Sequence, residues 1–431
     1  MSETGQPLLT RHQFGGFLPK GSIRLSVVEL FVVCFGVFLA PYVNLRFSEV
    51  FFTYSDFFFC LSFALLLISG SIQRRPLSEA TSMWLFAFTL MFVGLSIGSL
   101  YHHRPDRGQI VIAQYLYSYL LLMVILIRRD PRESYLLAAV FLASIILVDI
   151  YGIYSLYYVG YVPGERTGAV TGAMRLATTL GNPNLAASIN ALTMPILLYF
   201  WSSGRLKAYF ALPLISIILL TVVSTSSNSG LFIMMVSLSV FSASVLTIRQ
   251  MLRLTLGLGV LVAGFTTFGS TDLLPVAFQK RVLSAYISGD ISEAGTYISR
   301  TELNKEAIGV IADERIVIVG IGADQFRERS VQNAPVHNLY LLLWVEGGML
   351  AVIGWVLFSG VGVLLWFSIR KAGGSTHALA IVATTVAVFL TIALFNPHMY
   401  ARVWTLPVFL CFGLGLTQLR RVELSDDLKA I

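Results

Sequence analysis

Charged residues are scarce in this chain, in which Asp, Glu, Lys and Arg make up only 12% of 431 residues. An average soluble domain contains about 25% of them, so this deficit excludes an ordinary soluble globular protein. The three cysteines, Cys34, Cys60 and Cys411, all lie inside apolar runs, where they indicate neither a disulfide framework nor a metal site. A Walker loop, a dinucleotide-binding fingerprint and an Asp-x-Asp pair are also missing. These absences argue against nucleotide chemistry and against metal-dependent nucleotide-sugar chemistry.

Long apolar runs are abundant instead, and 56% of the residues are hydrophobic. Runs of roughly 18 or more residues recur from end to end, and each is long enough to cross the ~30 Å hydrocarbon core of a bilayer. We therefore predict an all-α polytopic membrane protein with about twelve transmembrane helices. The predicted spans lie near 26–44, 53–71, 82–100, 109–127, 135–158, 184–201, 208–224, 229–247, 254–270, 349–369, 378–396 and 404–419.

The basic residues predict the orientation of the chain. In membrane proteins Lys and Arg concentrate in cytoplasmic loops, so the net charge of +7 does not require a nucleic-acid partner. Alternate loops of this chain are rich in Arg and poor in acids, whereas the opposite loops mix both signs. The positive-inside rule therefore places the tails 1–25 and 420–431 in the cytoplasm, with spans in 26–270 and in 349–419.

One far-side loop, residues 271–348, differs from the others in length and composition. Roughly a fifth of its residues are charged, close to the share in a soluble domain. In the segment SRTELNKEAIGVI, Leu303, Ala307 and Val310 recur at helical spacing, and Arg300 lies on the same side. We therefore predict an ordered helical cap on the outer face, which is periplasmic in a Gram-negative cell.

A single histidine, His337, stands at the start of the apolar run that ends this loop, APVHNLYLLLWVEGG. Pro335 suits the first turn of a helix, so we predict a short helix that runs to about Glu346 and stops at Gly347 and Gly348. The start of this helix would present His337 and Asn338. Imidazole titrates near neutrality and can take a proton from a hydroxyl group. The alternative is a histidine that only caps or packs.

A helix start is predicted in RLATTLGNPNLAAS, residues 175–188. Asn182 suits the N-cap position and Pro183 the first helical position, and the free N–H groups of such a start attract anions. Arg175 lies seven residues upstream of Asn182 and offers a planar fork for phosphate. The alternative is an ordinary well-capped helix.

Two more arginines, Arg281 and Arg300, lie in the far-side loop near apolar segments. A cluster of arginines suits a diphosphate, because bidentate charge-assisted hydrogen bonds are strong. Asp56 and Asp149 fall within predicted spans, where a carboxylate is a functional candidate. Asp56 is close to an outer end, and the sequence names no partner for Asp149. The alternative for Asp149 is a helix-packing contact.

With these residues in hand, the chain resembles the O-antigen ligase and O-antigen polymerase superfamily. The resemblance rests on GNPNLAA at 181–187, SRTELNKEA at 299–307 and VHNLYLLLWVEGG at 336–348, in that order, and on the large loop before the last predicted spans. It covers most of the chain. It implies a GT-C-like membrane glycosyltransferase of the bacterial inner membrane, with its active site in the periplasm and no metal or other cofactor.

The resemblance also implies the substrates and the roles of residues. The donor is a glycan on undecaprenyl diphosphate, whose lipid tail lies among membrane lipid between the spans. The acceptor is the lipid A–core sugar in ligases and another lipid-linked glycan in polymerases. The essential histidine of the family maps onto His337, and its diphosphate-binding arginines onto Arg175, Arg281 and Arg300. The supporting residues would be Asn182, Asn184, Asn338 and Glu346.

One segment departs from the family pattern. Many relatives carry an arginine in the Ser-rich turn STSSNSG, residues 224–230, where this chain has Asn228. The turn therefore reads as a hairpin between two spans, although its hydroxyls could line a cavity. We expect an O-antigen ligase, with the polymerase reaction as the alternative. A polysaccharide transporter or flippase is the alternative of another class, and it would favour charges within the spans. Few charges lie there, and a scaffold without enzymatic activity is the remaining alternative.

Overall fold

The structure is a computed structural model. It describes residues 22–46, 52–73, 75–102, 105–127, 129–163, 168–245, 275–288, 297–313, 316, 318–397 and 399–429. Within these residues the chain forms helices and only two isolated β-bridges, Arg46 with Thr53 and Val170 with Leu176. The all-α class predicted from the sequence is therefore confirmed for the described part of the chain.

The helices follow one another in this order: α1 (Ser22–Leu39), α2 (Tyr54–Ile68), α3 (Ala80–Tyr101), α4 (Pro105–Tyr115), α5 (Leu122–Leu126), α6 (Pro131–Tyr154), α7 (Pro183–Ser202), α8 (Ala208–Ser224), α9 (Asn228–Val245), α11 (Val276–Phe278), α12 (Ser284–Ser288), α13 (Tyr297–Asp313), α14 (Gln325–Arg329), α15 (Leu339–Lys371), α16 (Thr376–Ala393) and α17 (Arg402–Lys429). Three π-helical segments join or extend them, η2 (Leu116–Leu121), η3 (Ser155–Val159) and η6 (Gln279–Leu283), and a short 3-10 turn, η4 (Thr178–Leu180), precedes α7.

The described helices make this a multi-pass membrane protein. Seven of them are long and apolar enough to cross a bilayer, namely Ala80–Tyr101, Gly108–Leu126, Pro131–Val159, Pro183–Ser202, Asn228–Val245, Leu339–Lys371 and Thr376–Ala393. Shorter apolar helices stand at four other predicted spans, at Leu25–Leu39, Tyr54–Ile68, Ala208–Ser224 and Arg402–Thr417. The predicted span 254–270 and most of the tail 1–25 lie outside the described residues.

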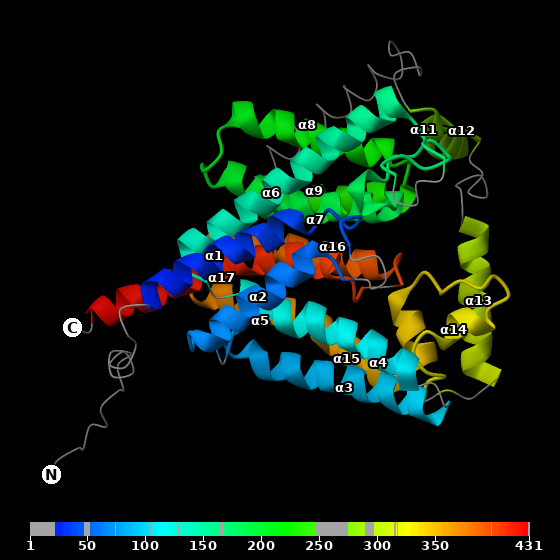
Figure 1. Cartoon of the computed structure of the whole chain (residues 1–431), viewed down its shortest axis with the longest axis horizontal. Coiled ribbons are helices and arrows are strands. Elements are labelled where there is room, and N and C mark those ends of the chain that lie inside the picture. The colour runs from blue at the N-terminus through cyan, green and yellow to red at the C-terminus, as the bar shows by residue number, and fades with distance from the viewer. Residues whose placement is uncertain are drawn as a thin grey trace.

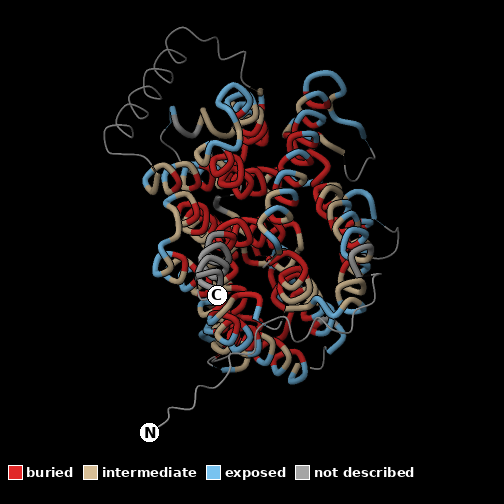
Figure 2. Tube along the Cα trace, turned by 90° about the vertical axis from the view of Figure 1, so that its left-hand side faces the viewer, coloured by how far each residue is buried: buried red, intermediate tan, exposed pale blue. Residues whose placement is uncertain are grey.

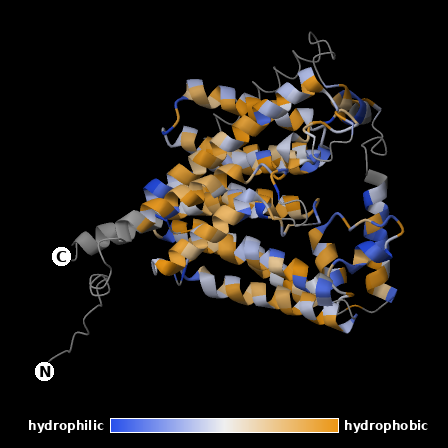
Figure 3. Ribbon diagram, viewed as in Figure 1, coloured by the Kyte–Doolittle hydropathy of each residue, from blue (hydrophilic) through white to orange (hydrophobic). Residues whose placement is uncertain are grey.

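The helices form a bundle with two distinct ends. Helix α1 begins and α17 finishes at one end, whereas α11, α12, α13 and α14 gather at the other (Figure 1). Buried residues line the inside of the bundle and exposed residues its outside (Figure 2). Hydrophobic residues cover most of the bundle, and hydrophilic residues are frequent on α13 and the neighbouring loops (Figure 3). The helices of the predicted cap therefore lie opposite the end where α1 starts and α17 finishes.

Helices α3 and α15 pack closely because glycines bring their backbones together. A Cβ added at Gly94 would lie 2.5 Å from the carbonyl oxygen of Gly347, and one at Gly354 would lie 2.5 Å from the backbone nitrogen of Met91. A Cβ at Gly98 would lie 2.8 Å from the carbonyl oxygen of Glu346. Small residues allow such close approach between membrane helices. The pair therefore forms a rigid support for the outer end of α15.

The start of α15 differs from the sequence prediction. Pro335 does not open the helix, because Asn338 has extended backbone angles and its side chain accepts a hydrogen bond from the N–H of Leu341 at 3.2 Å. The helix begins one residue later, at Leu339. The predicted break is confirmed, since Gly348 has φ +68 and interrupts an otherwise continuous helix. The last helix also differs, because α17 continues through most of the predicted tail 420–431.

Ion pairs fasten both ends of the bundle. Near the start of α1, Glu29 pairs with Arg129 at 2.6 Å, and both side chains are buried. At the opposite end, Arg402 of α17 pairs with Asp56 of α2 at 2.8 Å and donates to the hydroxyl of Thr53 at 3.0 Å. Asp56, a functional candidate in the sequence, therefore joins α2 to α17.

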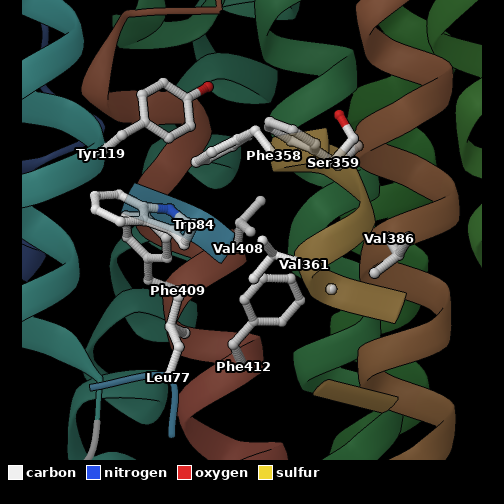
Figure 4. Close-up of a pocket in the computed structure, with 12 residues that line it drawn as sticks. Leu77, Trp84, Tyr119, Phe358, Ser359, Val361, Val386, Val408, Phe409 and Phe412 are labelled. Atoms are coloured by element: carbon white, nitrogen blue, oxygen red, sulfur yellow. The ribbon is translucent and has the colours of Figure 1, made fainter. Parts of the chain in front are cut away.

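A cavity within the bundle is lined mainly by aromatic and aliphatic side chains (Figure 4). Trp84 of α3, Tyr119 of η2, Phe358 of α15 and Phe409 of α17 contribute to its wall. The polar side-chain groups of its lining are the hydroxyls of Tyr119 and Ser359 and the indole N–H of Trp84. The cavity therefore suits packing or an apolar chain rather than acid–base chemistry.

Candidate functional site

Arg175 sits at the end of a tight loop that precedes α7. The N–H of Thr171 donates to the carbonyl oxygen of Arg175 at 2.9 Å, and the hydroxyl of Thr171 accepts from the N–H of Arg175 at 3.3 Å. The bridge between Val170 and Leu176 closes the same loop. The N–H of Leu176 donates to the carbonyl oxygen of Ser224 at 3.0 Å, so the loop is attached to the outer end of α8.

The guanidinium of Arg175 is held by residues of two other segments. Its Nε donates to the carbonyl oxygen of Thr225 at 2.9 Å, and its Nη2 donates to Oδ1 of Asn184 at 3.1 Å. The hydroxyl of Ser227 donates to the same Asn184 oxygen at 2.8 Å. The Ser-rich turn 224–230 is therefore more than a hairpin between two helices, because it fixes the direction of Arg175.

The start of α7 is formed as the sequence predicts. Asn182 is the N-cap residue, and its Oδ1 accepts hydrogen bonds from the N–H groups of Asn184 at 2.9 Å and Leu185 at 3.2 Å. Gly181 precedes it with φ +71, a left-handed conformation that glycine adopts without strain. Asn182 and Asn184 thus have separate tasks: the first caps the helix and the second orients an arginine.

The structure brings together the three arginines that the sequence singled out. Burial, and next the repulsion from Arg281 and Arg300, lower the pKa of Arg175 to about 10. Burial and the repulsion from Arg281 also lower the pKa of Arg300. Each of these shifts requires that the guanidinium groups lie close enough to repel one another. Arg281 comes from η6 and Arg300 from the first turn of α13, so three distant segments converge.

No carboxylate within the described residues pairs with Arg175, Arg281 or Arg300. The Nε atoms of Arg281 and Arg300 are buried and make no hydrogen bond to another described group. A buried donor without a partner is costly, and like charges in one place add repulsion. The cluster therefore offers directed donors and positive charge, the combination that binds a phosphate or diphosphate group.

His337 lies on a segment that is attached to the helix carrying Arg300. Helix α13 packs against α15, and Leu303 and Ala307 are buried in this contact region, as their helical spacing predicts. The loop before His337 is fixed to α13 by a hydrogen bond between Ser299 and Gln332. His337 is half-buried and immediately precedes Asn338, the N-cap residue of α15. His337 thus stands at the end of the bundle where α13 packs against α15.

The acids of α13 face this loop. Gln332 donates to the carboxylate of Glu302 at 3.1 Å, and the N–H of Val331 donates to the carboxylate of Glu306 at 2.9 Å. These bonds use the acidic side chains of α13 to hold the loop. They leave the positive charge of Arg300, on the same helix, without compensation from Glu302 or Glu306.

Glu346 has a different environment from the arginine cluster. It is only 6% exposed, and it lines a small pocket with Tyr115, Asp324 and Tyr400. Its carbonyl oxygen accepts from the N–H of Gly322 at 2.9 Å, and its carboxylate faces the N–H groups of Asp324 and Phe326. These contacts join Glu346 to the segment that contains Gly322, Asp324 and Phe326.

The described part of the chain contains no cluster of metal-binding side chains. Among the residues that the structure describes, no three or more His, Cys, Asp or Glu side chains come together in a group suited to a metal ion.

Comparison with known proteins adds no assignment. No protein-family model matches the chain, and no curated protein matches it. Membership of the O-antigen ligase and polymerase superfamily therefore stays a prediction from the sequence motifs.

Sequence reasoning missed two contributors to this site. The carbonyl group of Thr225 holds Arg175, but a backbone acceptor leaves no signature in the sequence. Ser227 orients Asn184 across 43 residues of sequence, and only the packing of α7 against α9 brings them together. The serines of the turn gave a weak signal, which a hairpin explained equally well.

Proposed function

We propose that the protein is a membrane glycosyltransferase that moves a glycan from undecaprenyl diphosphate to an acceptor hydroxyl, and that this acceptor is the lipid A–core sugar of an O-antigen ligase. The observation that carries the proposal is the cluster of Arg175, Arg281 and Arg300, which repel one another and have no acidic partner among the described residues. Such a cluster is stabilised when an anion binds, and a diphosphate supplies enough charge for three guanidinium groups.

The chemistry follows from the residue types. Neutral His337 accepts the proton of the acceptor hydroxyl. The hydroxyl oxygen then attacks the anomeric carbon of the donor sugar from the face opposite the phosphate, so the configuration inverts. The bond between that carbon and the phosphate oxygen breaks, and undecaprenyl diphosphate leaves with the electron pair. The arginines stabilise the developing charge of the leaving diphosphate.

The proposed setting is the bacterial inner membrane. The shorter apolar helices and the segment 254–270 would complete about twelve spans in a GT-C-like arrangement, with both termini in the cytoplasm and the site in the periplasm. The position of α13 opposite the end where α1 starts and α17 finishes supports this orientation (Figure 1). A site at the outer face would receive the lipid tail between spans and the glycan from the periplasm.

The polymerase reaction uses the same donor and needs the same arginines and histidine, so the acceptor distinguishes the two enzymes. A flippase is less well supported. Two of the buried acids in the described helices, Glu29 and Asp56, are paired with arginines. These two acids therefore do not form a charged route across the bilayer.

The test is transfer by the purified protein in lipid vesicles that contain undecaprenyl-diphosphate-linked glycan, with either lipid A–core or no second acceptor. We expect glycan on lipid A–core. Lengthening of the lipid-linked glycan alone would instead establish a polymerase. No transfer of either kind, with donor bound to folded protein, would refute the proposal.

Variants test the role of His337 in the same assay. We expect His337→Ala to abolish transfer while donor binding and thermal unfolding stay unchanged. The matched control is His377→Ala, because His377 is also half-buried but lies in the first turn of α16. Normal transfer by His337→Ala would exclude this residue as the base.

A further inference from the structure

Asp149 is a buried carboxyl group in the middle of the bundle. It lies on α6 and is 1% exposed. Its Oδ1 accepts a hydrogen bond from Nδ2 of Asn190 on α7 at 3.1 Å. Its Oδ2 is buried and has no hydrogen-bond partner among the described residues. The hydroxyl of Thr221 on α8 faces this carboxyl group and is otherwise without a partner. The group therefore meets two helices besides its own.

No charge compensates Asp149. It forms no ion pair within the described part of the chain, and only the uncharged side chains of Asn190 and Thr221 act on it from the helices packed around it. A buried carboxylate without a cation is strongly disfavoured, and such groups take up a proton instead. A carboxylic acid has an O–H that can donate to the Thr221 hydroxyl, and its other oxygen continues to accept from Asn190.

The hydrogen bonds from Asp149 lead along two helices to the outer end of the bundle. Along α7, Nδ2 of Asn190 also donates to the carbonyl oxygen of Ala186 at 3.0 Å. Ala186 lies two residues after Asn184, which accepts from Arg175. Along α8, the carbonyl oxygen of Thr221 accepts from the N–H of Thr225 at 3.0 Å. Thr225 is the residue whose carbonyl holds the Nε of Arg175.

Helix α6 also contacts the loop that carries Arg175. A Cβ added at Gly152, three residues after Asp149, would lie 3.0 Å from side-chain atoms of Leu176 and of Thr178. Helix α6 therefore fits closely beneath this loop, and Asp149 fixes α6 against the two helices that hold both acceptors of Arg175.

We propose that Asp149 is a protonated, neutral carboxyl group that ties α6 to α7 and α8 and thereby positions Arg175. Asp149 is a positioning residue, since it acts through Asn184 and Thr225. The consequence for substrate binding rests on the proposed function, whereas the protonation and the coupling to Arg175 do not.

Infrared spectroscopy tests the proton directly. We expect the carbonyl stretching band of a protonated carboxylic acid at neutral pH, and we expect Asp149→Asn to remove it. In Thr221→Val the band should move to higher wavenumber, because the acid loses the acceptor of its O–H. Absence of the band at neutral pH would overturn the proposal, and so would a band that appears only after sodium is removed, since that identifies a carboxylate that holds a cation.

Positioning of Arg175 is tested without any substrate by a double-mutant cycle in thermal unfolding. Asp149→Ala and Arg175→Gln are combined, and we expect their effects to be non-additive, as for residues of one network. The matched control is Ser144→Ala, because Ser144 lies on the same helix and bonds the carbonyl oxygen of Phe38 on α1. Its effect should add to that of Arg175→Gln. Additive effects for Asp149→Ala would refute the positioning role.

Binding of inorganic pyrophosphate gives the functional readout. We expect Asp149→Asn, which keeps both hydrogen bonds in a neutral side chain, to bind like the wild-type protein. Asp149→Ala should weaken binding about tenfold, the effect of a typical coupled site. If Asp149→Asn and Asp149→Ala lost the same amount of pyrophosphate affinity, the proposal that Asp149 is neutral would be wrong. If the wild-type protein binds no pyrophosphate, the proposed function fails, while the infrared band and the double-mutant cycle still decide the role of Asp149.

Discussion

Arg175 and Asn184 are joined by a hydrogen bond of 3.1 Å, from the guanidinium Nη2 to the amide Oδ1. The same amide oxygen accepts a hydrogen bond from Ser227 at 2.8 Å. Asn184 therefore connects the loop before α7 with the turn before α9. An uncharged acceptor orients the guanidinium and leaves its charge available to a ligand.

Substitution of Asn184 should separate orientation from charge. We expect Asn184→Ala to weaken pyrophosphate binding about tenfold, because a hydrogen bond to a charged group contributes roughly 1.5–3 kcal/mol. Asn184→Asp should weaken binding further and raise the unfolding temperature, because the new carboxylate pairs with Arg175. Titration calorimetry and thermal unfolding measure the two effects. Stronger pyrophosphate binding by Asn184→Asp would contradict the view that the positive charge of Arg175 binds the ligand.

Removal of one arginine should stabilise the protein without ligand. In Arg281→Gln the repulsion on Arg175 and Arg300 falls, so we expect an unchanged or higher unfolding temperature together with weaker pyrophosphate binding. This trade-off is common where a site is built for function rather than stability. Lys305→Gln serves as the control, because Lys305 is exposed on α13. A lower unfolding temperature for Arg281→Gln alone would show that the arginine is structural.

Pyrophosphate binding should weaken at alkaline pH. The pKa of Arg175 is about 10 in the folded protein, below its usual 12.5, so its charge is complete well below pH 10 and is lost above it. Pyrophosphate binding should fall through this range. The stability of the ligand-free protein should rise, because the unfolded chain binds more protons there. Pyrophosphate itself also titrates, so its contribution is removed by subtracting the binding profile of Arg175→Gln from that of the wild-type protein. Identical pH profiles for the two proteins would show that Arg175 does not titrate in this range.

Two glycine substitutions test the packing of α3 on α15. Gly94→Ala places a Cβ 2.5 Å from the carbonyl oxygen of Gly347, and we expect a loss of about 1–3 kcal/mol in unfolding free energy. Gly309→Ala in α13 meets nothing within 4 Å, and it should gain roughly 0.5–1 kcal/mol from helix propensity. Urea unfolding in detergent measures both. Equal effects would mean that the helices do not approach as closely as described.

Much of the fold could be predicted because the signals are local. Apolar runs located the described membrane helices, Asn182 and Pro183 located the start of α7, and the spacing of Leu303 and Ala307 located the buried face of α13. Each of these features depends on residues within a few positions of one another. The boundaries were less accurate, since Asn338 rather than Pro335 sets the start of α15.

The contacts of the site could not be predicted because they join distant segments. Arg175, Arg281 and Arg300 were predicted as site residues from their expected side of the membrane and from the family resemblance. Only the folded structure shows that their guanidinium groups repel one another. The partners of Asp149 were also hidden, because Asn190 is 41 residues away. Chemical type can be read from a sequence, whereas mutual distance requires the packing of the helices.

The break at Gly348 divides α15 into an outer part and an inner part. The outer part is attached to the cap, where Ile321 donates to the carbonyl oxygen of Val345 at 2.8 Å, and a Cβ at Gly348 would collide with the carbonyl group of Ile318. The inner part packs against α3, where a Cβ at Gly354 would lie 2.5 Å from the backbone nitrogen of Met91. Because α3 contacts α15 on both sides of Gly348, the break sets a fixed angle between the segment that follows His337 and the long apolar part of the helix.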